Sequence, residues 1–99
     1  MDMLNQNAPG QRRLTARFEG RVQGVGFRYT AVACAAAAGV TGYVSNLPDG
    51  DVELVAEGPE EQLRDLLARI QRSYLDRFIL RVHQQWSPAT GAFVAFTVQ

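Results

Sequence analysis

The chain has 99 residues, so it can form one domain with one modest hydrophobic core. Ten arginines balance ten acidic residues and no lysine occurs, which argues against broad nucleic-acid binding and excludes chemistry that depends on a lysine. The single cysteine, Cys34, cannot form an internal disulfide, and no apolar run reaches the roughly 18 residues of a membrane span. We therefore expect a cytoplasmic protein that binds neither membrane nor nucleic acid.

Residues 1–11 are polar and show little periodicity, which predicts a flexible N-terminal leader followed by a folded domain over 12–99. From residue 13 to residue 20 apolar and polar side chains alternate, as is typical of a strand with one buried face. The side chains expected to be buried there are Leu14, Ala16 and Phe18.

An alanine-rich segment predicts a helix that begins at Phe27 or Arg28 and ends before Gly39, a residue suited to the position after a helix. One apolar stripe is expected on it, formed by Phe27, Ala31, Cys34 and Ala38. Because Cys34 falls on this stripe, we expect it to serve packing.

The middle of the chain predicts a hairpin, with strands at 40–46 and 51–57 and a turn at 47–50. A second helix is expected to open at 58–61, with Pro59 at its first helical position. Its apolar stripe is Leu63, Leu66, Leu67 and Ile70, and its expected ion pairs are Glu60/Arg64 and Asp65/Arg69.

The C-terminal part predicts a strand over 77–86, a turn over 87–91 and a fifth strand over 92–98. In the first of these, Phe78, Leu80 and Val82 are expected on the buried face. The order is then β-α-β-β-α-β plus one strand, which predicts an α+β, ferredoxin-like two-layer sandwich with two helices on one face of a mostly antiparallel sheet. One RNA-binding fold shares this order, but it needs aromatic residues on its central strands, and 51–57 has none.

Residues 20–28 lead from the first expected strand into the first helix and contain three glycines followed by Arg28. Free backbone N–H groups at a helix start, together with a guanidinium, form a site suited to a phosphate group. Known phosphate motifs do not fit: a lysine-type loop would need glycine at Val25, a dinucleotide loop glycine at Tyr29, and a cysteine phosphatase cysteine at Val22. The same glycines could instead serve only a tight turn.

A site with no covalent nucleophile and no lysine suits a substrate whose leaving group departs without a proton. A carboxylate does so, because a simple carboxyl group has a pKa of about 4, and an acyl phosphate releases one. Asn46 ends the second expected strand, and its amide oxygen could orient a water toward phosphorus. Asn46 could also simply end the strand.

Residues 20–28, followed by Gly42-Tyr43-Val44-Ser45-Asn46 and then 49–53, resemble the acylphosphatases over about 14–98. The resemblance implies the ferredoxin-like fold with five strands, hydrolysis of acyl phosphates, no cofactor, Arg28 as the catalytic phosphate-binding arginine, and Asn46 as the residue that orients water. The phosphate-binding backbone is expected to be Val22, Gln23, Gly24, Val25 and Gly26.

We expect acyl phosphate and phosphate as the small-molecule partners, no metal, and a monomer, although an exposed fifth strand leaves a dimer open. The alternative function is a non-catalytic module that binds phosphate or an acyl phosphate. The only histidine, His83, has no second ligand candidate near it in sequence and is expected to be structural.

Overall fold

The structure, a computed structural model, describes residues 10–99, so most of the expected leader lies outside the described residues. Its elements follow the predicted order with one short 3-10 helix, η1, added. They are β1 (Gln11–Gly20), α1 (Phe27–Ala38), β2 (Thr41–Asn46), β3 (Val52–Pro59), α2 (Glu60–Arg72), η1 (Tyr74–Phe78), β4 (Ile79–Pro88) and β5 (Phe96–Val98).

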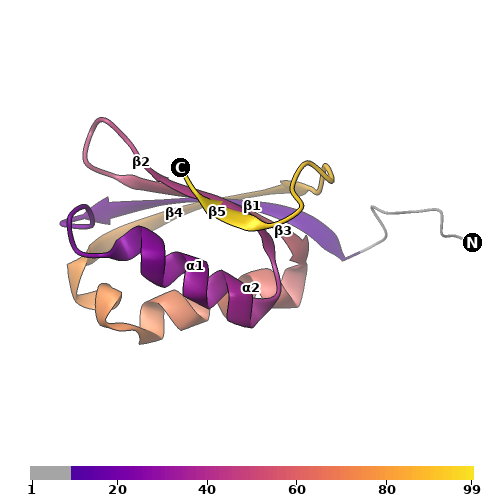
Figure 1. Cartoon of the computed structure of the whole chain (residues 1–99), viewed down its shortest axis with the longest axis horizontal. Coiled ribbons are helices and arrows are strands. Elements are labelled where there is room, and N and C mark those ends of the chain that lie inside the picture. Colours follow the sequence, from indigo (N-terminus) through magenta and orange to yellow (C-terminus); the bar gives the residue numbers. More distant parts are fainter. Residues whose placement is uncertain (1–9) are drawn as a thin grey trace, which may run out of the picture.

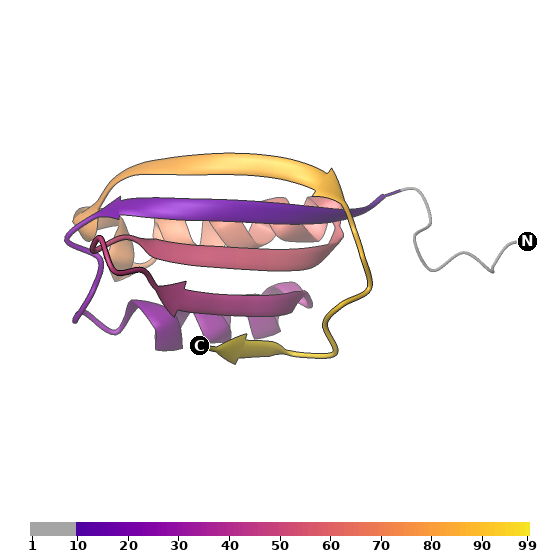
Figure 2. The same ribbon diagram turned by 90° about the horizontal axis from the view of Figure 1, so that it is seen from above.

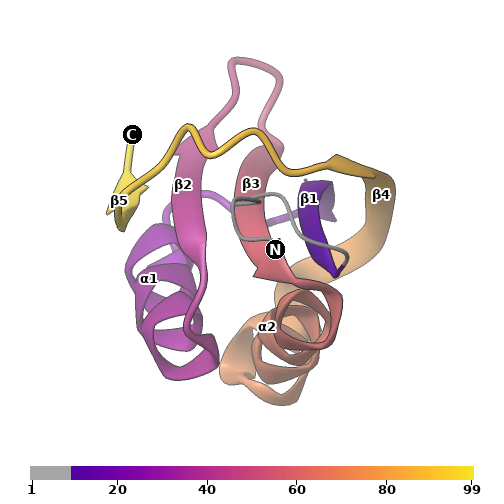
Figure 3. The same cartoon turned by 90° about the vertical axis from the view of Figure 1, so that its right-hand side faces the viewer.

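The five strands form one sheet in the order β4-β1-β3-β2-β5, and both helices pack on the same face of it (Figures 1 and 3). All neighbouring strands are antiparallel except β2 and β5, which run parallel (Figure 2). The predicted α+β, ferredoxin-like sandwich is confirmed.

Strand β1 lies inside the sheet between β4 and β3, and its predicted face is buried. Leu14, Ala16 and Phe18 are fully buried beneath the helices. The strand starts two residues earlier than expected, because Gln11 pairs with Pro59 of β3. The last residue assigned to the leader is therefore part of the sheet.

Helix α1 starts after Gly26 and ends before Gly39, and both glycines have positive φ, near 80° and 76°. Its buried stripe is Phe27, Ala31, Ala35 and Ala38. Ala35, one position after Cys34, takes the place in the buried stripe that was expected for Cys34. Cys34 is half-buried at the edge of the stripe, on the side that faces α2, and packs against the core.

The hairpin of β2 and β3 is confirmed, with the Gly50 N–H donating to the Leu47 carbonyl at 3.2 Å in its turn. Strand β3 is more buried than an alternating pattern predicts, because Val55 and Glu57 on the face away from the helices are also buried. The segment of residues 89–95 crosses that face on its way from β4 to β5 (Figure 3).

Helix α2 buries the predicted stripe and forms the two predicted ion pairs, each at 2.8 Å. Pro59 was expected at the first helical position of α2, but it is the residue immediately before the helix. Pro59 has extended backbone angles and still pairs with Gln11 in the sheet.

The C-terminal third differs most from the prediction. Residues 77 and 78 belong to η1, β4 begins at Ile79, and Leu80 is 70% exposed. The pairing of β1 with β4 shifts register between Glu19 and Gly20, and this irregularity inverts the inward and outward alternation at Leu80. β5 has only three residues, and most of the expected strand over 92–98 is irregular.

Candidate active site

The loop between β1 and α1 is held in a shape that requires glycine. Its first residue, Arg21, donates its backbone N–H to the Phe78 carbonyl at 3.0 Å. Gly24 and Gly26 follow with φ near 79° and 80°, a left-handed conformation that other residues adopt at a cost. Because these two positions carry no side chain, the loop backbone itself is exposed where it meets the helix start.

The first turn of α1 has unpaired backbone donors and no acidic side chain. Thr30 is the first residue whose N–H bonds within the helix, to the Gly26 carbonyl at 3.1 Å, and no side chain caps the helix start. The N–H groups of residues 27–29 are therefore free to bind an anion. Arg28 adds a guanidinium in the same turn, where a cation is unfavourable by about 0.3–1 kcal/mol unless an anion accompanies it.

These groups surround a hollow of about 120 Å³. A water occupies about 30 Å³ of liquid volume, so the hollow has room for one small tetrahedral anion. The residues that line it are Val22, Gly24, Gly26, Phe27, Arg28, Tyr29 and Asn46.

The structure thus brings Arg28 and Asn46 to one hollow, together with three of the five loop residues expected from the sequence. Gln23 and Val25 do not line it. Sequence reasoning did not single out Phe27 and Tyr29, which do, although their position beside Arg28 at the helix start was a usable signal.

The side chain of Gln23 connects the loop to the hairpin. Its side-chain amide donates to the carbonyls of Leu47 and Asp51, both at 2.8 Å. Asn46 immediately precedes Leu47, so this pair of hydrogen bonds fixes the end of β2 beside the loop. The Asp51 carboxylate is in turn held by Arg17 at 2.6 Å.

The end of β5 also reaches the site. The Arg28 Nη1 donates to the Gln99 carbonyl oxygen at 3.3 Å, while the Gln99 N–H donates to Val44 of β2 at 2.8 Å. This contact was not predicted, because no sequence pattern indicates that residue 99 returns to the start of α1.

The carboxyl, imidazole and thiol groups of residues 10–99 lie outside the hollow. His83 contacts Glu19 on β1, and this hydrogen bond lowers the pKa of the Glu19 carboxyl group below its ordinary value. Within residues 10–99 no three metal-ligating side chains gather at one place.

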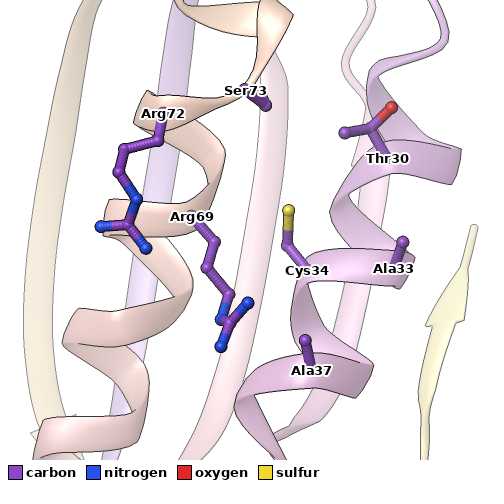
Figure 4. Close-up of a pocket in the computed structure, with 7 residues that line it drawn as sticks. All are labelled: Thr30, Ala33, Cys34, Ala37, Arg69, Arg72 and Ser73. Atoms are coloured by element: carbon purple, nitrogen blue, oxygen red, sulfur yellow. The ribbon is translucent and has the colours of Figure 1, made fainter.

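A wider groove of about 310 Å³ lies between α1 and α2, and Figure 4 shows Cys34 and Arg69 facing it. Burial raises the pKa of the Cys34 thiol above its ordinary value, which disfavours the reactive thiolate. The Arg69 guanidinium is paired with Asp65 on its own helix. None of the residues predicted to bind phosphate lines this groove, so the smaller hollow is the candidate active site.

In the part of the chain that the structure describes, the helices are too short or too polar to cross a lipid bilayer.

Fold and hollow together define a small two-layer α+β protein with a compact glycine-containing loop at the start of α1. The family model described as Acylphosphatase matches residues 14–98. An acylphosphatase of Acidothermus cellulolyticus is 48% identical over 90 residues, which cover 88% of this chain and 86% of the relative. One from Thermus thermophilus is 44% identical over 79 residues, covering 80% and 90%.

The crystal structure of the acylphosphatase from Bacillus subtilis superposes with a TM-score of 0.82 at 30% identity, covering 89% of this chain and 98% of that one. The chain therefore belongs to the acylphosphatase family of hydrolases.

Proposed function

We propose that the chain hydrolyses acyl phosphates to a carboxylate and inorganic phosphate by direct attack of water, without a metal. In this proposal the backbone of 22–26 and Arg28 hold the phosphoryl group, and Asn46 orients the water. The observation that supports it is that Arg28 and Asn46, which come from different elements, line one hollow at the start of α1.

Binding of the phosphoryl group follows from the donors at the hollow. The free N–H groups of residues 27–29 and the positive end of the helix dipole favour negative charge. Within residues 10–99 the Arg28 guanidinium has one weak contact, to the Gln99 carbonyl at 3.3 Å, which leaves its other donors for phosphate oxygens. The backbone N–H groups are held in place by the fold before substrate binds, so they stabilise charge in the transition state without reorganising.

Bond cleavage needs no acid in the hollow. The leaving group of an acyl phosphate is a carboxylate, whose conjugate acid has a pKa of about 4, so it departs unprotonated at neutral pH. The leaving group of an alcohol phosphate is a far stronger base and would need a proton donor. Among residues 10–99, no carboxyl, imidazole, thiol or lysine lines the hollow, and the Tyr29 phenol is the only acidic side chain that does.

Water activation is assigned to Asn46. Its side chain is exposed at the end of β2, on the hairpin that Gln23 fixes beside the loop. An amide oxygen can accept a hydrogen bond from water and direct a lone pair toward phosphorus, although it is not a strong base. Positioning suffices because the leaving group is good.

The test is hydrolysis of benzoyl phosphate in the presence of EDTA, compared with p-nitrophenyl phosphate. We expect EDTA-resistant release from the first and little from the second. Arg28→Ala should lose about 3 kcal/mol or more of transition-state stabilisation, at least a hundredfold in rate, whereas Arg21→Ala, which alters an exposed arginine of the same loop outside the hollow, should remain near wild type.

Asn46→Ala should lose turnover but keep the affinity for inorganic phosphate, measured by calorimetry. Wild-type rates in both the Arg28 and Asn46 variants would reject the assigned roles. Phosphate binding by the wild type without any turnover would instead identify a non-catalytic binding module.

A further inference from the structure

The side chain of Tyr74 extends from η1 to the loop between β1 and α1 (residues 21–26). Its hydroxyl donates to the Val25 carbonyl oxygen at 2.5 Å and accepts a hydrogen bond from the Thr30 hydroxyl at 3.3 Å. One phenol therefore connects the loop, the first turns of α1 and the segment after α2. Tyr74 itself does not line the hollow.

The bond to Val25 determines the orientation of a peptide group that belongs to the site. In a planar trans peptide, the carbonyl of one residue and the N–H of the next point in opposite directions. When Tyr74 holds the Val25 oxygen, it therefore turns the Gly26 N–H away from itself. Gly26 lines the hollow, and its N–H makes no hydrogen bond within residues 10–99, so this N–H is available to a bound anion.

The fit of Tyr74 against the loop is close. A Cβ atom at Gly26 would lie 2.9 Å from the Tyr74 hydroxyl oxygen, so the phenol occupies the space that a side chain at residue 26 would need. Within residues 10–99 the Val25 carbonyl has no hydrogen-bond partner other than the Tyr74 hydroxyl, so this one bond restrains the peptide before Gly26.

The rest of the Tyr74 side chain contributes little to the core. It is 49% exposed, and its ring meets Phe78 edge-on with centroids 6.3 Å apart. Removal of the hydroxyl alone should therefore change the loop far more than the stability of the fold.

We propose that Tyr74 is a positioning residue, which holds the Val25–Gly26 peptide so that the Gly26 N–H faces the phosphoryl group. The inference rests on the proposed function of the loop. It extends the site to a residue that touches neither phosphate nor water.

The test compares Tyr74→Phe with Tyr43→Phe. The second variant removes the same hydroxyl from a bond to Glu53 at 3.2 Å on the other face of the sheet, so it is a matched control. We expect Tyr74→Phe to lower kcat/KM for benzoyl phosphate and to weaken inorganic phosphate binding, each about tenfold, the equivalent of about 1.4 kcal/mol. Urea unfolding should show the two variants equally stable.

A double-mutant cycle with Thr30→Val adds a second readout. Thr30 acts only through Tyr74 in this proposal, so Thr30→Val should cost less than Tyr74→Phe, and the double variant should be no worse than Tyr74→Phe alone. In NMR spectra, phosphate should shift the Gly26 amide signal strongly in the wild type and weakly in Tyr74→Phe.

The outcomes separate this inference from the proposed function. An active wild type with an equally active Tyr74→Phe variant, or an unchanged phosphate response at Gly26, would overturn the role of Tyr74 and leave the function standing. Phosphate binding without hydrolysis in the wild type would reject the function, and a weaker affinity in Tyr74→Phe would still support the tyrosine. A wild type that neither binds phosphate nor hydrolyses substrate would overturn both.

Discussion

The replacement Glu57→Gln tests how the crossing segment of residues 89–95 is attached to the sheet. The Glu57 side chain is only 5% exposed and accepts hydrogen bonds from Arg13 Nε at 2.7 Å, from the N–H and hydroxyl of Thr90 at 3.0 and 2.8 Å, and from the N–H of Gly91 at 2.9 Å. Glutamine keeps the shape but loses the charge and one acceptor. Two adjacent backbone donors then lose a charged partner.

The magnitude follows from this geometry. Hydrogen bonds to a charged group contribute about 1.5–3 kcal/mol each, but Thr90 and Gly91 are exposed, so water can replace part of what they lose. We therefore expect a loss of about 2 kcal/mol in the free energy of unfolding at pH 7, which lowers the Tm by roughly 10 °C in a domain of this size.

The pH dependence has a definite sign. Burial alone would raise the pKa of Glu57, but the hydrogen bonds from Arg13, Thr90 and Gly91 outweigh it and hold the pKa below its ordinary 4.5. A carboxyl group with a lowered pKa stabilises the fold above its unfolded-state pKa, and this stabilisation is lost as the pH falls through the lowered value. The difference between wild type and Glu57→Gln should thus be largest near neutral pH and shrink below pH 4.5.

Urea unfolding followed by circular dichroism from pH 7 to pH 3 measures this difference directly. Glu61→Gln is the matched control, because Glu61 is exposed and makes no hydrogen bond or ion pair with residues 10–99. A variant as stable as wild type at pH 7 would refute the reasoning. So would a difference that stays constant as the pH falls.

Three further predictions concern the fold and the free thiol. Gly42→Ala should cost more than about 3 kcal/mol of stability, because its Cβ would lie 1.9 Å from the Val55 carbonyl oxygen. Gly50→Ala has open space around its Cβ and should cost only the strain of a positive φ, about 1–2 kcal/mol. Equal Cm values for the two variants in urea would contradict this prediction. Leu54→Ala, at a fully buried position of β3, should cost about 2–5 kcal/mol in the same measurement. Cys34 should react with a thiol-specific disulfide reagent more slowly than glutathione at pH 7.5, because burial raises its pKa, and an equal or faster rate would show the thiol to be accessible and ionised.

The features that the sequence predicted well are those that local patterns determine. The alternation at Leu14, Ala16 and Phe18 and the stripe of α2 follow from burial on one face of a strand or helix, and the structure buries them as expected. The placement of Arg28 at a helix start follows from the glycines before it and the alanines after it. Asn46 lies at the same hollow because β2 ends there.

The features that it missed depend on contacts between distant segments. The inverted side of Leu80 results from a register shift opposite Glu19 and Gly20, which the pattern of β4 alone cannot indicate. In place of the first part of the expected fifth strand, Thr90 and Gly91 bond to the distant Glu57, and β5 begins only at Phe96. The bond from Tyr74 to Val25 spans 49 positions, and neither residue carries a local signal for it.

The candidate site draws on three stretches of chain that lie far apart in sequence: the loop before α1, the end of β2 and residue 99 beyond β5. No fragment shorter than nearly the whole domain contains all three. During refolding, helices and the central hairpin can form before the last strand docks, so catalytic competence should be the final property that the molecule acquires. Enzymatic turnover would then report complete assembly of the domain, whereas a spectroscopic signal of helix formation reports only the beginning of assembly.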